Sequence, residues 1–473
     1  MKFPYRYIAR ITLEATTPLA VGSDTFREDL DSPVAKDFNN LPYIPGTALA
    51  GWLRHKMEKF NPEILPYFGD EPGRQEDEET RGSNLIFSDA LLMGKDGKVV
   101  QQIKDLSDDD FFSRFYDLPV RQHVAIDYRG TAKEGNLFDR EVVYKGSRFK
   151  FEIALELENP DDEAWKRILQ AFAENDLHLG GGEFDGFGEL KIVEIQEARF
   201  DLQKELDDFL KITVDLNNDE GLKPAEIPEF SSPIFIEDEY MLTGMESFHH
   251  FGAGYGDMEV DHINYKEEII VWENGKPNFK EMFVMPGTSI KGALAHRVAY
   301  HYNKEQGNTV EKILEDYFNR PLPEEKEALE NELSFLNNII KERDFEKMAE
   351  DYLYENNPAV ADLFGTAKNS KTGKGRSGKV IIKDTFLDGN MKEHIFYHNK
   401  IDRFTGGTVA GALYSEKVLH IHKTRLHLKI KKETDKTYLR KALNDLLNGT
   451  LPVGGMVNKG HGIFKQLKTN NHE

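Results

Sequence analysis

Two glycine-rich segments, residues 180–188 and 454–462, carry backbone groups that could bind phosphate. Each consists of Gly-Gly, four further residues and Gly-x-Gly. Glycine lets backbone amides approach a phosphate chain closely, but the same residues also form tight turns. The first segment follows a predicted helix and precedes a predicted strand, the reverse of the order in dinucleotide-binding folds. It therefore predicts contacts to a nucleic-acid backbone or a tight turn, and it argues against a nucleotide cofactor.

Histidine and cysteine are the other side chains examined for catalysis. The chain has no cysteine, which excludes disulfides, thiolate zinc sites and cysteine nucleophiles. Three histidine pairs occur, but none has the i, i+4 spacing of a two-histidine metal site on a helix. The pairs are His249 with His250, His296 with His301, and His420 with His422. We expect them to be ordinary surface or structural histidines.

Charge limits how the chain could bind nucleic acid. The 473 residues carry a net charge of −22 at pH 7, which disfavours attraction of the whole molecule to nucleic acid or to an anionic membrane. Any contact to RNA or DNA must come from a local basic surface. A basic cluster at residues 368–379 is one candidate, and a solvated loop is the alternative. Its members are Lys368, Lys371, Lys374, Arg376 and Lys379.

Length and hydropathy define the class of protein. Apolar residues make up 39% of the chain, enough to form real cores, and the length predicts two or three domains. No apolar run approaches the roughly 18 residues of a bilayer span, and the first residues have no signal-peptide core. We expect a cytoplasmic protein without membrane contact.

Five blocks of sequence occur twice, in the same order. Residues 44–56 and 285–297 share Pro, Gly, Thr, Gly, Leu and His without a gap. The other pairs are 68–69 with 364–365, 85–89 with 380–384, 123–127 with 398–402, and the two glycine-rich segments. This repetition predicts two copies of one domain.

Each copy must position these residues with the same elements. Alternating apolar residues predict strands near residues 5–13, 149–157 and 426–430. Helical spacing predicts helices after Thr47 and Thr288, which are plausible N-caps, and near residues 165–172 and 439–447. A hairpin turn is predicted near Asn274-Gly275. The order strand, helix, strands, helix, strand predicts an α+β class with two tandem ferredoxin-like (RRM-like) domains that carry insertions.

The domain boundaries follow from composition. We predict a first domain over residues 1–200, an acidic, turn-rich linker over 201–232, and a second domain over 233–473. The second domain carries an insertion at about 303–358, rich in Glu, Lys and Leu with helical spacing, which predicts surface helices.

Several motifs together resemble a known family. These are the Pro-Gly-Thr helix start, residues 401–406 with the sequence Ile-Asp-Arg-Phe-Thr-Gly, the C-terminal glycine-rich segment, and residues 31–37 with the sequence Asp-Ser-Pro-Val-Ala-Lys-Asp. In this order, and largely twice, they resemble the RAMP superfamily of CRISPR-associated proteins. The match is to the Cas-seven-like backbone subunit of type III effector complexes. The resemblance spans residues 5–200 and about 233–468, and two copies in one chain resemble the fused-subunit variants.

The resemblance implies a function. Such subunits bind CRISPR guide RNA beside other effector subunits, and a "thumb" element wedges into the duplex of guide and complementary target RNA. An aspartate then cleaves the target with a divalent metal, which implies Asp31 as the catalytic and metal-binding residue and Mg²⁺ or Mn²⁺ as the cofactor. A carboxylate can hold Mg²⁺ through water, and a distorted backbone brings the 2′-hydroxyl into line. Neighbouring acids that could join Asp31 are Asp24, Glu28, Asp29 and Asp37.

The same resemblance, together with the basic cluster, gives a set of RNA-binding candidates. Aromatic residues at the thumbs, Tyr128, Phe138 and Tyr414, could stack on bases or belong to the core. The RNA-binding candidates are Arg54, His123, Arg129, Gly180, Gly181, Lys291, Lys371, Lys374, Arg376, His398, Arg403, Phe404, Gly454, Gly455 and Lys459.

The second copy departs from the family pattern because it lacks Asp-Ser-Pro-Val. Asp261 is the best positional counterpart of Asp31, with Asp257 second, so the second copy is either a second catalytic site or a scaffold. In the first copy, Ala50 stands where Lys291 stands in the second. Two other functions stay open for the whole chain: a catalytically silent guide-RNA scaffold, or a metal-independent endoribonuclease that processes repeat RNA. A protein-interaction adaptor is a weaker alternative.

Overall fold

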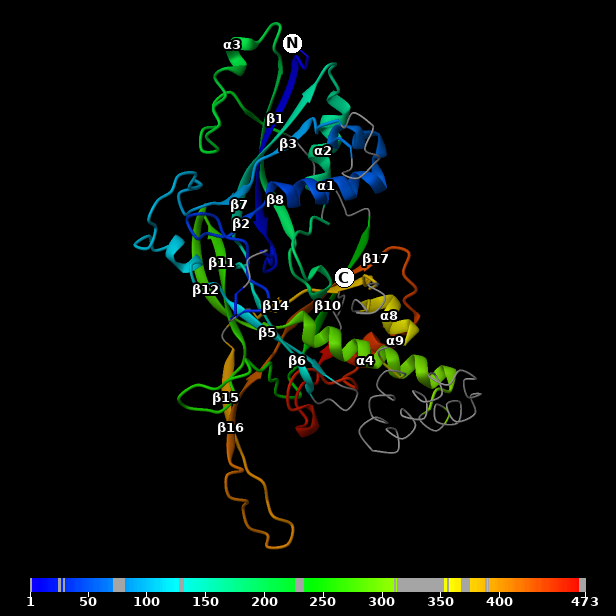
Figure 1. Cartoon of the computed structure of the whole chain (residues 1–473). Helices are drawn as coiled ribbons and strands as arrows, with labels where there is room; N and C mark the ends of the chain where they lie inside the picture. Colours follow the sequence, from blue (N-terminus) through cyan, green and yellow to red (C-terminus); the bar gives the residue numbers. More distant parts are fainter. Residues whose placement is uncertain are drawn as a thin grey trace, which may run out of the picture.

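The computed structural model describes most of the chain. The described residues are 2–23, 27–28, 30–70, 81–126, 132–174, 176–225, 234–309, 312, 353–354, 357–366, 375–387, 389 and 391–467. Within them, two antiparallel sheets each carry helices on one face (Figure 1). No helix among these residues is long and apolar enough to cross a bilayer.

The first copy is built on a sheet with the order β2-β4-β7-β1-β8-β9, in which β3 also pairs with β7. Its central strand β1 (Tyr5–Ala15) is antiparallel to both β7 (Arg148–Leu157) and β8 (Leu190–Asp201). Helices α1 (Gly46–Phe60) and α2 (Asp162–Ala173) cover one face, where their apolar side chains join the sheet in one core. The shorter strands are β2 (Tyr43–Ile44), β3 (Leu85–Phe87), β4 (Ala90–Leu92) and β9 (Lys223–Pro224).

The second copy repeats this arrangement. Its sheet has the order β13-β17-β10-β18, with β10 (Phe235–Thr243) and β17 (Thr424–Lys431) at the centre. Helices α4 (Gly287–Gln306), α8 (Pro358–Phe364) and α9 (Thr437–Leu447) form its core with the sheet. The edge strands are β13 (Val380–Ile382) and β18 (Lys465–Gln466). The α+β class and the two ferredoxin-like domains predicted from sequence are confirmed.

Each copy extends a hairpin from its sheet, and we call these the thumb hairpins. The first consists of β5 (Val120–Ile126) and β6 (Ala132–Glu141), and the second of β15 (Lys392–His398) and β16 (Tyr414–His420). In Figure 1 the second hairpin and its loop project away from the body of the molecule, whereas the first lies beside α4. Nε2 of His296 on α4 lies 3.3 Å from the carbonyl oxygen of Ile126.

A third hairpin, β11 (Lys266–Glu273) with β12 (Lys276–Met285), joins the copies. Its turn residues Asn274 and Gly275 both have positive φ, which confirms the predicted turn. Its apolar side chains Ile270, Trp272 and Phe279 belong to the core of the first copy. The short strand β14 (Thr385–Phe386) pairs with β12.

The predicted N-caps are wrong. Helices α1 and α4 begin at Gly46 and Gly287, one residue before each threonine, and no side chain of the local sequence caps them. Instead, the carboxylates of Asp89 and Asp384 accept the glycine N–H, both at 2.8 Å. These aspartates follow β3 and β13, so a distant residue caps each helix. The glycine is required because a Cβ at Gly46 would lie 2.9 Å from two carbonyl oxygens.

The segment between the copies packs on the first sheet. Helix α3 (Leu206–Phe209) follows β8, and β9 pairs with β8. Figure 1 shows α3 on one side of the sheet and α1 and α2 on the other. We call the sheet face that points away from the helices the outer face. In the first copy these helices are α1 and α2, and in the second copy they are α4 and α9. The predicted insertion at 303–358 lies mostly outside the described residues.

Candidate nucleic-acid interface and cleavage site

The two glycine-rich segments have the same geometry. Each surrounds a short 3-10 helix, η3 (Glu183–Asp185) or η5 (Val457–Lys459). Gly180 and Gly454 have φ of +85° and +95°, and a Cβ there would lie 2.4 and 2.7 Å from the carbonyl oxygens of Ala20 and His250. The tight-turn interpretation therefore explains both glycines.

The backbone amides of the next glycines are already used. Gly181 N–H donates to Ala20 O and Gly455 N–H donates to His250 O, both at 2.7 Å. These two amides are occupied in this conformation, so RNA contacts by the segments stay a prediction and require other atoms.

The thumb hairpins place the two predicted histidines at equivalent positions. His123 lies opposite Phe138 on the partner strand, and His398 lies opposite Tyr414. Each imidazole stacks on its aromatic neighbour, with ring centroids 4.9 Å apart in both copies. Burial, and then the nearby Arg140, lower the pKa of His123 to about 4. His123 is therefore neutral at pH 7 and a poor proton donor.

Asp31 lies at the base of the first thumb hairpin. Its Oδ2 accepts the backbone N–H of Asp139 on β6 at 3.0 Å. The next residue, Ser32, forms a parallel bridge with Arg140. The loop after β1 is thereby held against β6, and the Asp31 carboxylate is brought beside the thumb.

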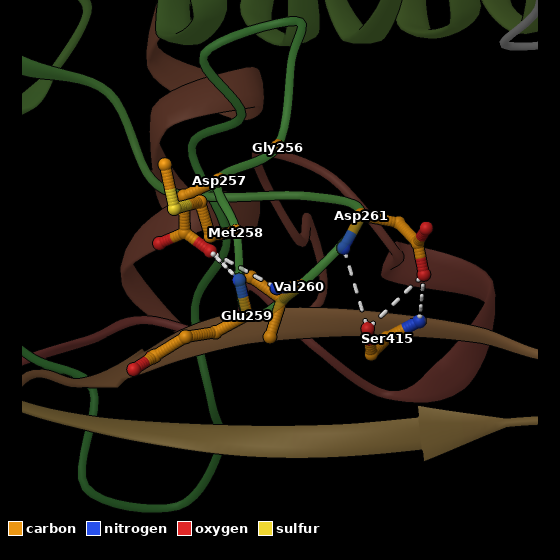
Figure 2. A pocket seen from close by; sticks show the side chains of 7 residues that line it. All are labelled: Gly256, Asp257, Met258, Glu259, Val260, Asp261 and Ser415. Carbon is orange, nitrogen blue, oxygen red and sulfur yellow. Dashed lines mark hydrogen bonds between the residues drawn. The ribbon is translucent and has the colours of Figure 1, made fainter.

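Asp261 has the same place in the second copy. Its Oδ2 accepts N–H of Ser415 on β16 at 2.7 Å and the Ser415 hydroxyl at 3.0 Å (Figure 2). His262 bridges Glu416 as Ser32 bridges Arg140. The hydrogen bonds from Ser415 lower the pKa of Asp261, so this carboxylate is ionised at neutral pH. Asp31 and Asp261 therefore occupy equivalent positions, as their order in the sequence predicts.

Asp261 lines an open pocket of about 510 Å³ with residues 256–260 and Ser415. Asp257, the second candidate, has a structural role there: its Oδ1 accepts N–H of Glu259 and Val260 at 2.8 and 2.9 Å. Its Oδ2 pairs with Lys417 at 2.6 Å. The bond to Lys417, then those to the backbone, lower the pKa of Asp257 to about 2.

The two sites differ in their second carboxylate. Asp139 in the first copy corresponds to Ser415 in the second, because each amide binds the candidate aspartate. The Asp139 Oδ1 atom is buried and has no hydrogen-bond partner among the residues that the structure describes. Sequence reasoning did not single out Asp139. The sequence signal that could have identified Asp139 is its place on β6, the second strand of the first thumb hairpin.

The donor set in the first copy fits a hard divalent cation. Mg²⁺ takes oxygen ligands and is usually held by one or two carboxylates with water and substrate phosphates. The hydrogen bond from the Asp139 amide places the two acidic residues side by side, and the buried Asp139 Oδ1, which has no partner among the described residues, could serve as a second oxygen ligand. Within the described part of the chain, no group of three His, Asp or Glu residues is arranged to hold a metal, so the other ligands would be water and phosphate.

Several RNA-binding candidates already have protein partners. Lys291 pairs with Asp185 of η3 at 2.9 Å, which joins the two copies. Arg376 pairs with Asp362. Arg54 lies 3.6 Å from Glu58 on the same helix.

In the second thumb, His398 pairs with buried Glu416 at 2.6 Å, whereas the candidates in the loop are exposed. Arg403 and Phe404 lie in its loop, and Phe404 is 99% exposed. Lys459 on η5 lies over the Tyr414 ring, 4.4 Å from its centroid. Arg129, Lys371 and Lys374 lie outside the described residues, as do Tyr128 and Lys368.

The contacts between the copies were missed by sequence reasoning. Buried Arg121 on β5 pairs with Glu267 at 2.7 Å and Asp384 at 2.6 Å. Glu189, the residue before β8, pairs with Lys383 and Lys429, at 2.8 and 2.6 Å. These residues are far apart in sequence, so only the folded chain reveals that they meet.

Comparisons with known proteins agree with the duplicated fold. The family model of the RAMP superfamily matches residues 12–191 and again residues 275–465. The chain is also 27% identical over 190 residues to a protein of Methanocaldococcus jannaschii named CRISPR system Cms endoribonuclease Csm3. That match covers 35% of this chain and 68% of the other protein. The two family matches fall on the two ferredoxin-like copies, and the chain therefore belongs to the RAMP superfamily, with two RAMP domains in one polypeptide.

Proposed function

We propose that the chain is a guide-RNA-binding backbone subunit of a type III CRISPR ribonucleoprotein and that its first copy cleaves complementary target RNA at Asp31. The observation that carries the proposal is the position of Asp31 at the base of a thumb hairpin, held by the Asp139 amide. The relative named as an endoribonuclease supports the reaction class.

The chemistry requires the target RNA to be distorted before it is cut. Cleavage needs the 2′-hydroxyl in line with the phosphorus, and a wedge between base pairs can supply that geometry. In the second copy, exposed Phe404 at the thumb loop is suited to stack against a base. A bound Mg²⁺ or Mn²⁺ would stabilise the charge that develops on the phosphate. Asp31 and Asp139 would hold the ion and orient it beside the thumb.

The first copy is the better candidate for catalysis. It has two carboxylates at the site, whereas the second has Asp261 with Ser415. The acids closest in sequence to Asp261 are engaged, since Asp257 and Glu259 both pair with Lys417. This difference supports a scaffold role for the second copy as the alternative to a second cut.

The test is target-RNA cleavage by the purified guide-bound complex with and without EDTA. We expect Asp31→Asn to abolish one cut and to leave guide RNA content unchanged. Asp108→Asn, an exposed aspartate elsewhere on the first copy, is the matched control and should cleave normally. Full cleavage by the Asp31→Asn complex would refute the assignment.

Two further results would redirect the proposal. Asp261→Asn tests the second copy: loss of a second cut would show that it is catalytic, and no change would show a scaffold. Cleavage that continues in EDTA at a repeat sequence would instead indicate a processing endoribonuclease.

A further inference from the structure

The outer face of the second sheet is covered by the first copy. Lys429 on β17 points to this face, because its neighbours Leu428 and Ile430 face the core. Its side chain is fully buried and pairs with Glu189 of the first copy. Gly186 packs so closely that a Cβ there would lie 2.5 Å from the carbonyl oxygen of Ile382. The first glycine-rich segment thus docks on the outer face beside β13.

The outer face of the first sheet is covered by the segment that follows β8, and not by another copy of the domain. Residues 203–225, which we call the cap, lie on this face up to the point where β9 joins the edge of the sheet beside β8. Three apolar side chains of the cap, Phe209, Ile212 and Leu222, form a cluster with Ile8 and Ala154 of the sheet. The cap therefore buries an apolar patch that would otherwise face solvent.

Polar contacts also fasten the cap. Arg10, which is 1% exposed, donates to the carbonyl oxygen of Thr213 at 2.6 Å and also to that of Asn218. Lys150 on β7 pairs with Asp219 at 2.7 Å. These contacts make the cap an integral layer on the sheet and not a loose connection.

The cap and the first glycine-rich segment occupy equivalent places. Ala154 lies opposite Ile86 where β7 pairs with β3, and Lys429 lies opposite Ile381 where β17 pairs with β13. Ala154 and Lys429 are therefore the same position in the two copies. The first contacts the cap, and the second contacts Glu189. A second glycine-rich segment that docked on the first copy in the same way would meet the cap at Ala154.

The charges at this interface also differ between the copies. In the second copy, Lys291, Lys383 and Lys429 meet acids of the first copy. The first copy has no charge at the corresponding positions, which are Ala50, Ser88 and Ala154. The glycine-rich segment of the second copy has Lys459 where the first has Asp185, and Ile463 where the first has Glu189. The acid–lysine matching therefore exists only between the first copy and the second.

We propose that the cap prevents a second copy of this chain from adding to the first, so that the chain enters an assembly as a single two-domain unit. The outer face of its second sheet is covered internally. The cap covers the outer face of its first sheet around Ile8 and Ala154 and leaves Ile86 on β3 51% exposed. The exposed glycine-rich segment of the second copy is thereby left for a ferredoxin-like domain of a different chain. That domain must have an uncovered outer face and an acidic or neutral side chain opposite Lys459. The proposal rests on the duplicated interface and not on RNA cleavage.

The test measures self-association without nucleic acid by sedimentation velocity over a hundredfold range of protein concentration. One variant replaces residues 206–222 with a Gly–Ser segment of equal length. A second, milder variant, Phe209→Asp with Ile212→Asp, undocks the cap without replacing it. Circular dichroism checks folding, and limited proteolysis within 203–225 reports undocking.

We expect the natural chain to remain a monomer and the uncapped variants to form concentration-dependent dimers and longer species. Adding Val457→Glu and Lys459→Glu, both exposed on η5, should return the uncapped variants to monomers. Folded, uncapped variants that stay monomeric would overturn the proposal. Oligomers indifferent to the η5 substitutions would overturn it too, because they would reflect non-specific contact of the apolar patch. Self-association of the natural chain that the η5 substitutions abolish would show that the cap does not block addition.

Discussion

The Arg121 ion pairs offer the sharpest test of how the two copies hold together. Arg121 lies on β5 of the first copy and is 5% exposed. Its guanidinium binds Glu267 and Asp384 of the second copy, whose side chains are each 1% exposed. Asp384 also accepts N–H of Gly287, so the same contact supports the start of α4. Arg121→Met removes the charge and keeps much of the side-chain volume.

The expected loss is large because two carboxylates stay buried without their counter-ion. Breaking a buried ion pair by removing one partner typically destabilises a protein by about 3–5 kcal/mol. With two carboxylates sharing one guanidinium, we expect the free energy of unfolding to fall by about 4 kcal/mol. The matched control is Arg167→Met, since Arg167 pairs with Glu63 on the surface, with side chains 38% and 54% exposed. That change should cost less than about 1 kcal/mol.

Urea denaturation followed by tryptophan fluorescence measures both variants. Trp272 reports the interface directly, because its Nε1–H donates to the carbonyl oxygen of Gly146 at 2.7 Å. The double variant Arg121→Met with Glu267→Gln should recover part of the loss, since it removes one buried charge. A cost for Arg121→Met no larger than that of Arg167→Met would refute the reasoning. The absence of any recovery in the double variant would refute the explanation by unpaired charge.

Three further predictions concern acid stability, the glycine-rich turn and the thumb. Burial raises the pKa of Glu189, but its two lysine partners more than offset this effect and hold the pKa at about 2. Because this pKa lies below the ordinary value for glutamate, the ion pairs with the lysines stabilise the fold above about pH 4.5. A contribution of about 3 kcal/mol is lost as the pH falls towards 2. Unfolding curves of Glu189→Gln should show a flatter acid dependence. Gly180→Ala should lower the free energy of unfolding by about 3 kcal/mol, because φ is positive there and the new Cβ would meet the carbonyl oxygen of Ala20. The control is Gly97→Ala, where φ is also positive but the space is open. It should lower the free energy of unfolding by about 1 kcal/mol in the same denaturation assay. Phe404→Ala should weaken target-RNA binding by about tenfold in a filter-binding assay, with guide content unchanged. Val214→Ala changes a similarly exposed residue on the cap and should have no effect. Equal affinity of both variants would contradict a stacking role for Phe404.

Much of the fold was predictable from sequence because its signals are local. Alternation and helical spacing depend on neighbouring residues, and the repeated blocks show that the same elements occur twice. The equivalence of Asp31 and Asp261 follows from the same order of elements. The prediction of the helix caps failed because the real caps are not local. Asp89 and Asp384 bind the N–H groups of glycines 43 and 97 residues away, so no local sequence pattern could indicate these contacts.

The candidate site was predictable in part. Sequence order placed Asp31 before the helix start, but only the folded chain shows that the Asp139 amide holds it and that Asp139 adds a carboxylate. Lys291 was predicted to bind RNA, and the structure shows it paired with Asp185. A side chain's type is a property of the sequence, whereas its partner depends on which surfaces meet.

The amino-acid sequence by itself determined that this chain contains two copies of one α+β domain and where their motifs lie. The tertiary structure alone decided how the copies join. The acids of the first glycine-rich segment meet lysines on the second sheet, and the cap covers the same face of the first sheet. The physical reason is range: secondary structure follows from residues a few positions apart, while a buried ion pair or a covered sheet face depends on surfaces that the whole chain brings together.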